Sequence, residues 1–122
     1  MSKFVIRKVK SGIKFDLRAT NGQTIATSEV YLTRASCIRG IESVRKNAPL
    51  AGTENHLQED YEKRTNPKFE MYQDKAGQYR FRLRARNGQI IAVSEGYTTR
   101  ASCENGIDSV RKNADIAEIF DE

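Results

Sequence analysis

The sequence predicts an α+β fold, in which tandem βββα(β) repeats form one antiparallel sheet with two helices packed on one face, related by a pseudo-twofold axis. Lys14 to Ala48 aligns with Arg80 to Ala114 without a gap, and 25 of the 35 positions are identical. In each copy, apolar residues alternate before an Asn-Gly pair, as a half-buried strand requires, and recur at helical spacing after it. The 122 residues are therefore expected to form a single domain of two repeats.

The alignment also sets the boundaries of the two units. Repeat 1 is placed at residues 1–58, with a linker from about residue 49, and repeat 2 at residues 59–122. The linker contains Pro, Gly, Thr and Asn, which are typical of a connector. Short strands are predicted at about residues 61–65, as a possible part of repeat 1, and at about 116–120, giving six to eight strands in all.

The Asn-Gly pair of each repeat predicts a hairpin with two alternative registers. A two-residue loop pairs Leu83 with Ala92, whereas a three-residue loop with a left-handed glycine and a bulge pairs Leu83 with Ile91. We predict the three-residue loop. In the two repeats it makes the pairs Leu83–Ile91, Phe81–Val93, Leu17–Ile25 and Phe15–Thr27.

One helix is predicted after each hairpin. Thr33 and Thr99 are the expected N-caps, because a threonine hydroxyl accepts a hydrogen bond from a free backbone amide there. Asn47 and Asn113 suit a left-handed helix ending. A glycine inside each helix indicates close contact between helix and sheet. The apolar stripe that faces the sheet consists of Cys37, Ile41, Val44 and Ala48, and of Cys103, Ile107, Val110 and Ala114.

The combination NGQxIAxSExYxTRASCxxGIxSVRKNA occurs twice. It resembles the YegP-like family of small bacterial proteins of unknown function, and the resemblance covers nearly the whole chain. The resemblance implies that the two units build one sheet with exchanged final strands, and that residues 61–65 and 116–120 are those strands. It implies no activity.

Net charge and composition limit the classes of partner that we expect for this protein. The net charge of +5 favours acidic partners such as nucleic acid or anionic lipid. The N-terminus contains neither the apolar run of a signal peptide nor a spanning helix, so we expect a cytoplasmic protein without a membrane partner. We also expect a monomer with internal pseudo-dimeric symmetry.

The first candidate site is a stripe of arginines at alternate positions of one strand in repeat 2. A basic sheet face can bind the phosphates of nucleic acid or another polyanion. The alternative is that the stripe is the solvated side of a half-buried strand. Repeat 1 has an aspartate and a threonine at two of the corresponding positions, so the stripe is not doubled. Its members are Arg80, Arg82, Arg84 and Arg86.

The second candidate is a polar cluster that occurs in both repeats and could line two equivalent pockets. The alternative is structural, because Glu near a helix start favours the helix dipole, Tyr packs the strand-to-helix corner and Ser satisfies the backbone. The cluster consists of Ser28, Glu29, Tyr31 and Arg34, and of Ser94, Glu95, Tyr97 and Arg100.

Neither a catalytic residue nor a metal ligand is predicted. A cysteine nucleophile needs an adjacent base. The one histidine, His56, lies in the linker, so Cys37 and Cys103 are assigned to the core as reduced thiols. One His and two distant Cys do not make a usual zinc site. No cofactor is expected, because the chain has neither a phosphate loop nor GxGxxG.

Three functions stay open. The first is a non-catalytic binding module, with nucleic acid or another polyanion as the most concrete ligand. The second is a protein-interaction or structural module that uses the sheet edges or the apolar sheet face. The third is an enzyme acting through Glu29 and Glu95, although we expect the protein not to be an enzyme.

Overall fold

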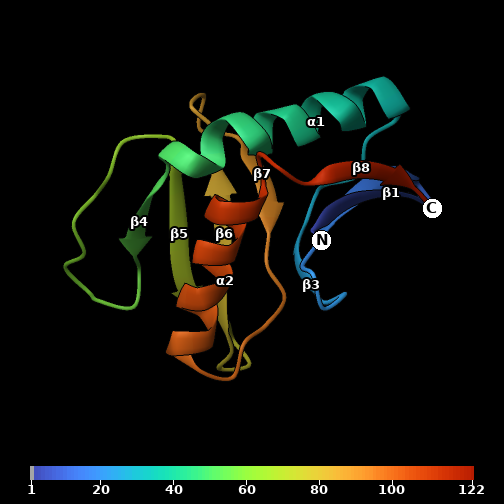
Figure 1. The fold of residues 1–122 in the computed structure, drawn as a ribbon. Coiled ribbons are helices and arrows are strands. Elements are labelled where there is room, and N and C mark those ends of the chain that lie inside the picture. The colour runs from blue at the N-terminus through green and yellow to red at the C-terminus, as the bar shows by residue number, and fades with distance from the viewer. Residues whose placement is uncertain (1) are drawn as a thin grey trace.

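The computed structural model describes residues 2–122, which form one eight-stranded sheet and two α-helices (Figure 1). The strand order is β4-β5-β6-β7-β3-β2-β1-β8. The strands are β1 (Lys3–Val9), β2 (Gly12–Arg18), β3 (Thr24–Thr27), β4 (Gly52–Asn55), β5 (Lys68–Gln73), β6 (Tyr79–Arg84), β7 (Ile90–Val93) and β8 (Glu118–Asp121). The helices are α1 (Arg34–Asn47), α2 (Arg100–Asn113) and the short 3-10 helix η1 (Ala48–Leu50).

The two outermost strands are exchanged between the repeats. β4 follows α1 in repeat 1 but pairs in parallel with β5, the first strand of repeat 2. β8 ends repeat 2 and pairs in parallel with β1. The other pairs are antiparallel. The predicted fold class and strand exchange are therefore confirmed. The sheet is antiparallel except at its edges, where each edge strand arrives through a helix.

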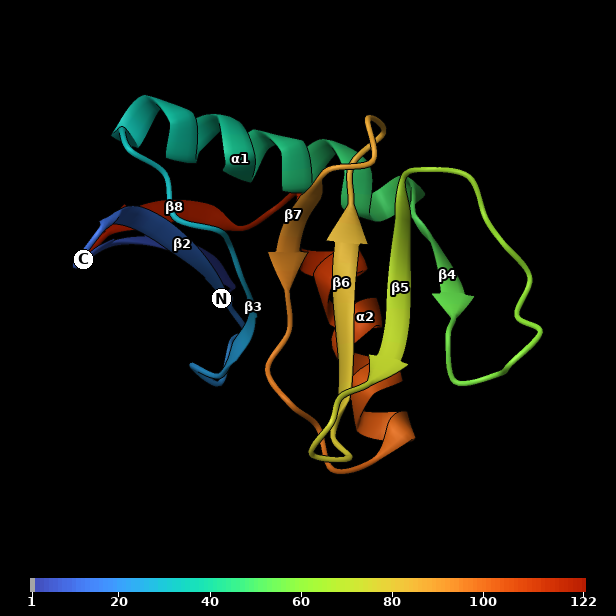
Figure 2. The ribbon, with the colours of Figure 1, turned by 180° about the vertical axis from the view of Figure 1, so that it is seen from behind.

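Both helices cover one face of the sheet, as Figure 1 and the reverse view in Figure 2 show. The strand order is symmetric about the junction of β3 and β7, where Thr27 pairs with Val93. The sheet twists strongly at this junction, so that β1 and β8 run across the view while β5 and β6 run along it. α1 thereby reaches β7, and α2 reaches β3, so each helix contacts the other repeat. Neither helix is long and apolar enough to span a membrane.

The core fills the space between the helices and the sheet. The predicted apolar stripes of both helices are buried there, against four fully buried phenylalanines. Burying one such side chain contributes about 1.5–3 kcal/mol. The helices also hold the exchanged strands: Arg45 on α1 donates to the carbonyl of Ala117 at 2.6 Å, and Arg111 on α2 donates to that of Ala51 at 3.0 Å. The four phenylalanines are Phe4, Phe15, Phe69 and Phe81.

The hairpins follow the predicted loop but not the predicted register beyond it. Arg84 pairs with Ile90, as the three-residue loop requires, and Gly88 has a φ of +86°. The register then shifts, so that Ile91 is an extra residue in the strand. Ile91 and Ala92 are both buried, which strict alternation does not allow. The predicted pairs Leu83–Ile91, Phe81–Val93, Leu17–Ile25 and Phe15–Thr27 are wrong; the observed pairs are Leu83–Ala92, Arg82–Val93, Leu17–Ala26 and Asp16–Thr27.

The last strand of repeat 1 is not where the sequence predicted it. Residues 61–65 form no strand, and β4 lies inside the segment that was predicted to be a linker. The prediction of a strand at about 116–120 is confirmed; the observed strand is β8, which begins at Glu118 and ends at Asp121. β4 is polar because its side chains bind charged partners: Thr53 accepts a hydrogen bond from Arg111 at 2.7 Å, and Glu54 accepts one from Lys68 at 2.7 Å.

The helix starts are as predicted, and the helix ends are not. The hydroxyls of Thr33 and Thr99 accept hydrogen bonds from backbone amides three residues later, both at 3.1 Å. Asn47 has a φ of −92°, which is not left-handed. Its side-chain amide instead donates to the carbonyl of Ser43 at 2.7 Å, and the chain continues into η1. Asn113 likewise donates within its own helix.

Candidate functional site

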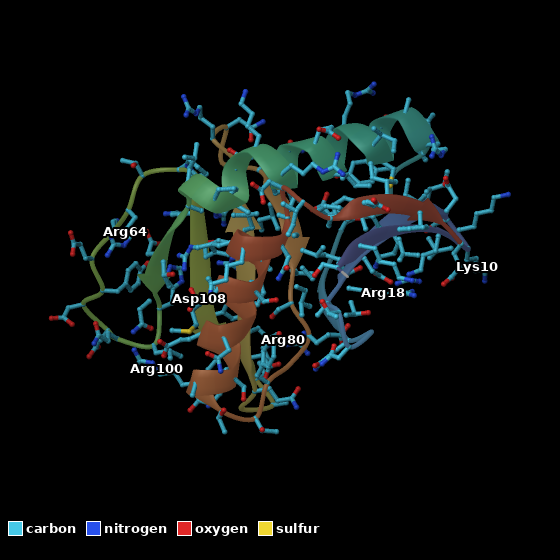
Figure 3. The ribbon with its side chains drawn as sticks, viewed as in Figure 1. Lys10, Arg18, Arg64, Arg80, Arg100 and Asp108 are labelled. Atoms are coloured by element: carbon cyan, nitrogen blue, oxygen red, sulfur yellow. The ribbon has the colours of Figure 1, made fainter. Side chains whose placement is uncertain are left out.

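The structure separates the predicted arginine stripe into paired and unpaired members. Arg82 and Arg84 both donate from Nε to one oxygen of Glu70, at 2.6 and 2.7 Å. Arg80, labelled in Figure 3, donates to Asp74 at 2.6 Å. Three of the four guanidinium groups therefore already bind a carboxylate within the chain. A phosphate would have to compete with these carboxylates.

Charged side chains gather on the face of the sheet that the helices do not cover. Lys68 and His56 contact the two oxygens of Glu54 at 2.7 and 2.6 Å. The ring of Tyr61 stacks on His56 with 4.2 Å between centroids, which ties the following loop to the sheet. We call this group the open-face cluster; it consists of Glu54, His56, Lys68, Glu70, Arg82 and Arg84.

The open-face cluster keeps its carboxylates ionised. Burial by itself raises the pKa of the Glu54 carboxyl. Hydrogen bonds from Lys68, the Arg64 amide and His56 outweigh burial and lower this pKa to about 2. Because Glu54 is ionised, it can only accept a hydrogen bond, so Nε2 of His56 carries the hydrogen and donates it to Glu54. Glu70 has a lowered pKa for the same kind of reason: hydrogen bonds from Arg82 and Arg84 outweigh its desolvation.

Three members of the open-face cluster have the composition of a metal site. Ligand atoms of Glu54, His56 and Glu70 lie within 4.8 Å of one another. The same carboxylates, however, bind one lysine and two arginines. Two negative charges are thus already exceeded by three positive charges, and a divalent cation would add to the excess. The cluster therefore fits an ion-pair network that fastens β4 to the sheet better than it fits a metal centre.

The residues of the repeated polar cluster make separate structural contacts. Ser28 accepts from the amide of Phe15 at 2.9 Å and donates to the carbonyl of Glu29 at 2.7 Å. The ring of Tyr31 stacks on Phe15, and its hydroxyl lies against Gly40 of α1. Burial raises the pKa of the Tyr31 hydroxyl. Ser94 and Tyr97 make the same contacts in repeat 2.

The remaining members of this cluster point outward. Glu29 and Glu95 are exposed. Arg34 pairs with Asp121 at 2.7 Å, and Arg100 pairs with Glu104 of its own helix at 2.8 Å. The structure thus does not bring the glutamates, tyrosines and arginines of the predicted cluster into a shared pocket.

Both cysteines lie in the core. Cys37 and Cys103 are fully buried and do not form a disulfide. Burial raises the pKa of both thiols, that of Cys103 to about 11, so they stay protonated at neutral pH. His56 belongs to the open-face cluster, on the other side of the sheet.

Three unpaired cations lie in a groove of about 440 Å³ between α1 and the β6–β7 loop. Arg39 and Lys46 of α1 line one wall, and Arg86 of the loop lines the other. All three side chains are exposed, and within residues 2–122 none of them forms an ion pair. We call this site the inter-repeat groove; it is lined by Arg39, Glu42, Ser43, Lys46, Asn47, Leu50, Ala85, Arg86 and Asn87.

Most residues of the open-face cluster and of the inter-repeat groove were not predicted from the sequence. Arg86 was singled out, but its groove partners Arg39 and Lys46 were not, because they lie in the other repeat. The sequence pattern could have predicted part of the open-face cluster. Glu70 lies between the apolar Phe69 and Met71, so in a strand it faces the same side of the sheet as the arginine stripe.

The comparisons with known proteins agree with the fold. Residues 11–54 and 74–121 each match the family described as "Domain of unknown function (DUF1508)". The chain is 36% identical over 122 residues to UPF0339 protein PA0329 of Pseudomonas aeruginosa, covering 99% of this chain and 97% of that protein. A UPF0339 protein of Methanosarcina acetivorans is 64% identical over 53 residues, which are 43% of this chain and 91% of that protein.

A solved structure supports the same relationship. The solution NMR structure of yegP from Escherichia coli, titled a protein of unknown function, superposes with a TM-score of 0.80 at 34% identity, covering 99% of this chain and 92% of that one. The family match falls on both repeats, and the fold is shared over the whole chain. The chain therefore belongs to the DUF1508 family of uncharacterised UPF0339 and YegP proteins.

Proposed function

We propose that this protein is a non-catalytic binding protein for polyanions, with nucleic acid as the most concrete ligand, and that it binds them in the inter-repeat groove. The observation that carries the proposal is the set of three unpaired cations, Arg39, Lys46 and Arg86, around one recess. Cations that bind no carboxylate are free to replace the counterions of a phosphate backbone, which is the main source of affinity in such complexes.

The groove supports polyanion binding better than the arginine stripe does. A phosphate at Arg82 or Arg84 must displace Glu70, whose side chain is 6% exposed. Leaving that carboxylate buried without a partner is costly. In the groove the one carboxylate, Glu42, is already bound by Arg45 at 2.6 Å, so it does not neutralise the three lining cations.

The experiment is an NMR amide titration with short single-stranded RNA and DNA, at low and at physiological salt. We expect shifts at α1 and at the β6–β7 loop that weaken as salt rises. The triple variant Arg39→Gln, Lys46→Gln, Arg86→Gln should lose roughly tenfold or more in affinity at low salt.

The matched control is Lys8→Gln, Lys10→Gln, Lys75→Gln. These lysines are exposed and line none of the described pockets, and their removal lowers the net charge by the same three units. Equal losses in the two triple variants would show a non-specific attraction and contradict the groove. Shifts confined to β5 and β6 would place the ligand on the arginine stripe instead, and no shifts at low salt would refute polyanion binding.

A further inference from the structure

We infer that the inter-repeat groove holds a single strand of a phosphodiester polymer along α1, and that each chain has one such site. The inference rests on the proposed function and specifies its ligand and stoichiometry.

The spacing of the cations favours a ligand with more than one anionic group. Arg39 and Lys46 are seven residues apart on α1, which is two helical turns or about 10 Å along the axis. Both face the groove. A ligand that contacts both must extend along the helix, as successive phosphates of a strand do, while Arg86 reaches it from the facing loop.

The size and lining of the groove favour one strand over a duplex. About 440 Å³ is in the range of small-molecule sites and holds part of one strand, not two paired strands. Leu50 is 65% exposed at one end and offers an apolar surface to a base, and Asn87 offers an amide. No aromatic ring is among the lining residues, so base stacking is absent and sequence preference should be weak.

The tandem repeat supplies an internal comparison. A cleft beside α2 and β3 overlaps the related position at Asn105 and Ser109, has a volume of about 310 Å³ and is lined by uncharged residues. Of the three basic residues in the groove, only Lys46 corresponds to another basic residue in the alignment of the repeats. Arg39, Lys46, Arg86 and Leu50 correspond to Asn105, Lys112, Thr20 and Ile116.

This comparison allows the site to be built a second time. Thr20 and Asn105 are exposed, so arginines at these positions should leave the fold intact. In the double variant Thr20→Arg, Asn105→Arg, the new arginines join Lys112 and the exposed Ile116. The positions of repeat 2 and its facing hairpin that correspond to the inter-repeat groove then carry the same three cations and the same apolar residue.

The experiment is isothermal titration calorimetry at low salt with oligothymidylate of about four nucleotides, a length at the lower end of single-strand site sizes. We expect one strand per wild-type chain. The logarithm of the association constant should fall against the logarithm of salt concentration with a slope of about −2, as three phosphate contacts on a single strand predict. The double variant should bind two strands per chain.

The outcomes separate the inference from the proposed function. Two strands per wild-type chain, or one strand per double variant with an unchanged NMR fold, would overturn the inference. Tighter binding of a DNA duplex or of ATP than of the oligonucleotide would also overturn it, while polyanion binding would stand. Absence of binding to both the oligonucleotide and heparin at low salt would overturn both.

Discussion

At the scale of residues, the two repeats pair the arginines of the open face with a carboxylate on different strands. Each half has a buried carboxylate on its open face, but on a different strand. In repeat 2 it is Glu70 on β5, bound by two arginines of β6. In repeat 1, Val5 stands at that position, and Asp16 on β2 takes the role, bound by Arg7 and Arg18. Asp16 occupies the position that corresponds to Arg82 in repeat 2, so the arginine stripe is not repeated in repeat 1.

Glu54 should make the stability of the protein depend on pH. Its folded-state pKa of about 2 lies below the ordinary value of 4.5, so its contribution is complete above pH 4.5 and is lost as the pH falls towards 2. We expect Glu54→Gln to lower the free energy of unfolding by about 1–3 kcal/mol at pH 7. Urea denaturation at pH 7, 4 and 3 should show this difference shrinking.

The control for this measurement is Glu59→Gln, which removes an exposed carboxylate from the adjoining loop. It should change stability by less than about 0.5 kcal/mol at each pH. A Glu54→Gln difference that stays constant from pH 7 to pH 3 would contradict the role of the ionised carboxylate.

Gly106 is predicted to be essential to the packing of α2. Alanine in place of glycine usually stabilises a helix by about 1 kcal/mol. Here a Cβ would collide with the hydroxyl of Tyr97 and lie 3.0 Å from Phe81. We expect Gly106→Ala to destabilise the protein by about 1–3 kcal/mol in urea denaturation. Adding Tyr97→Phe removes the hydroxyl and should recover part of the loss; a stabilised Gly106→Ala protein would refute this account.

At the scale of elements, the exchanged strand β4 lies in a segment whose composition does not predict a strand. The gap-free alignment extends past Ala114, because Leu50 to Asn55 corresponds to Ile116 to Asp121. That extension of the alignment locates β4. Its residues are Gly, Thr, Glu and Asn, which are typical of a connector and do not predict a strand. They form a strand because β5 supplies backbone partners and Lys68 supplies a charge, and both lie far along the chain.

The exchange predicts the behaviour of one repeat alone. In a fragment of residues 1–58, β1 lacks β8, and β4 lacks β5. Two copies can supply these partners to each other, as the two repeats do within the chain. We therefore expect sedimentation equilibrium to show a folded dimer, or circular dichroism to show an unfolded chain. A folded monomer would contradict the need for both repeats.

At the scale of the whole molecule, the inter-repeat groove exists because the repeats assemble. Its cations come from α1 of repeat 1 and the β6–β7 loop of repeat 2. The two walls meet because the twist at the β3–β7 junction carries α1 over the other hairpin. No single repeat contains this arrangement.

The sequence by itself determined the repeat, the α+β class, the helix N-caps and the buried stripes. These features depend on local periodicity and capping, which near neighbours in the chain specify. Tertiary structure decided the position of β4, the bulge at Ile91, the pairing of three arginines with carboxylates and the meeting of Arg39 with Arg86. Each of these depends on groups that are distant in sequence, and burial and Coulomb attraction act on distance in space rather than on order along the chain.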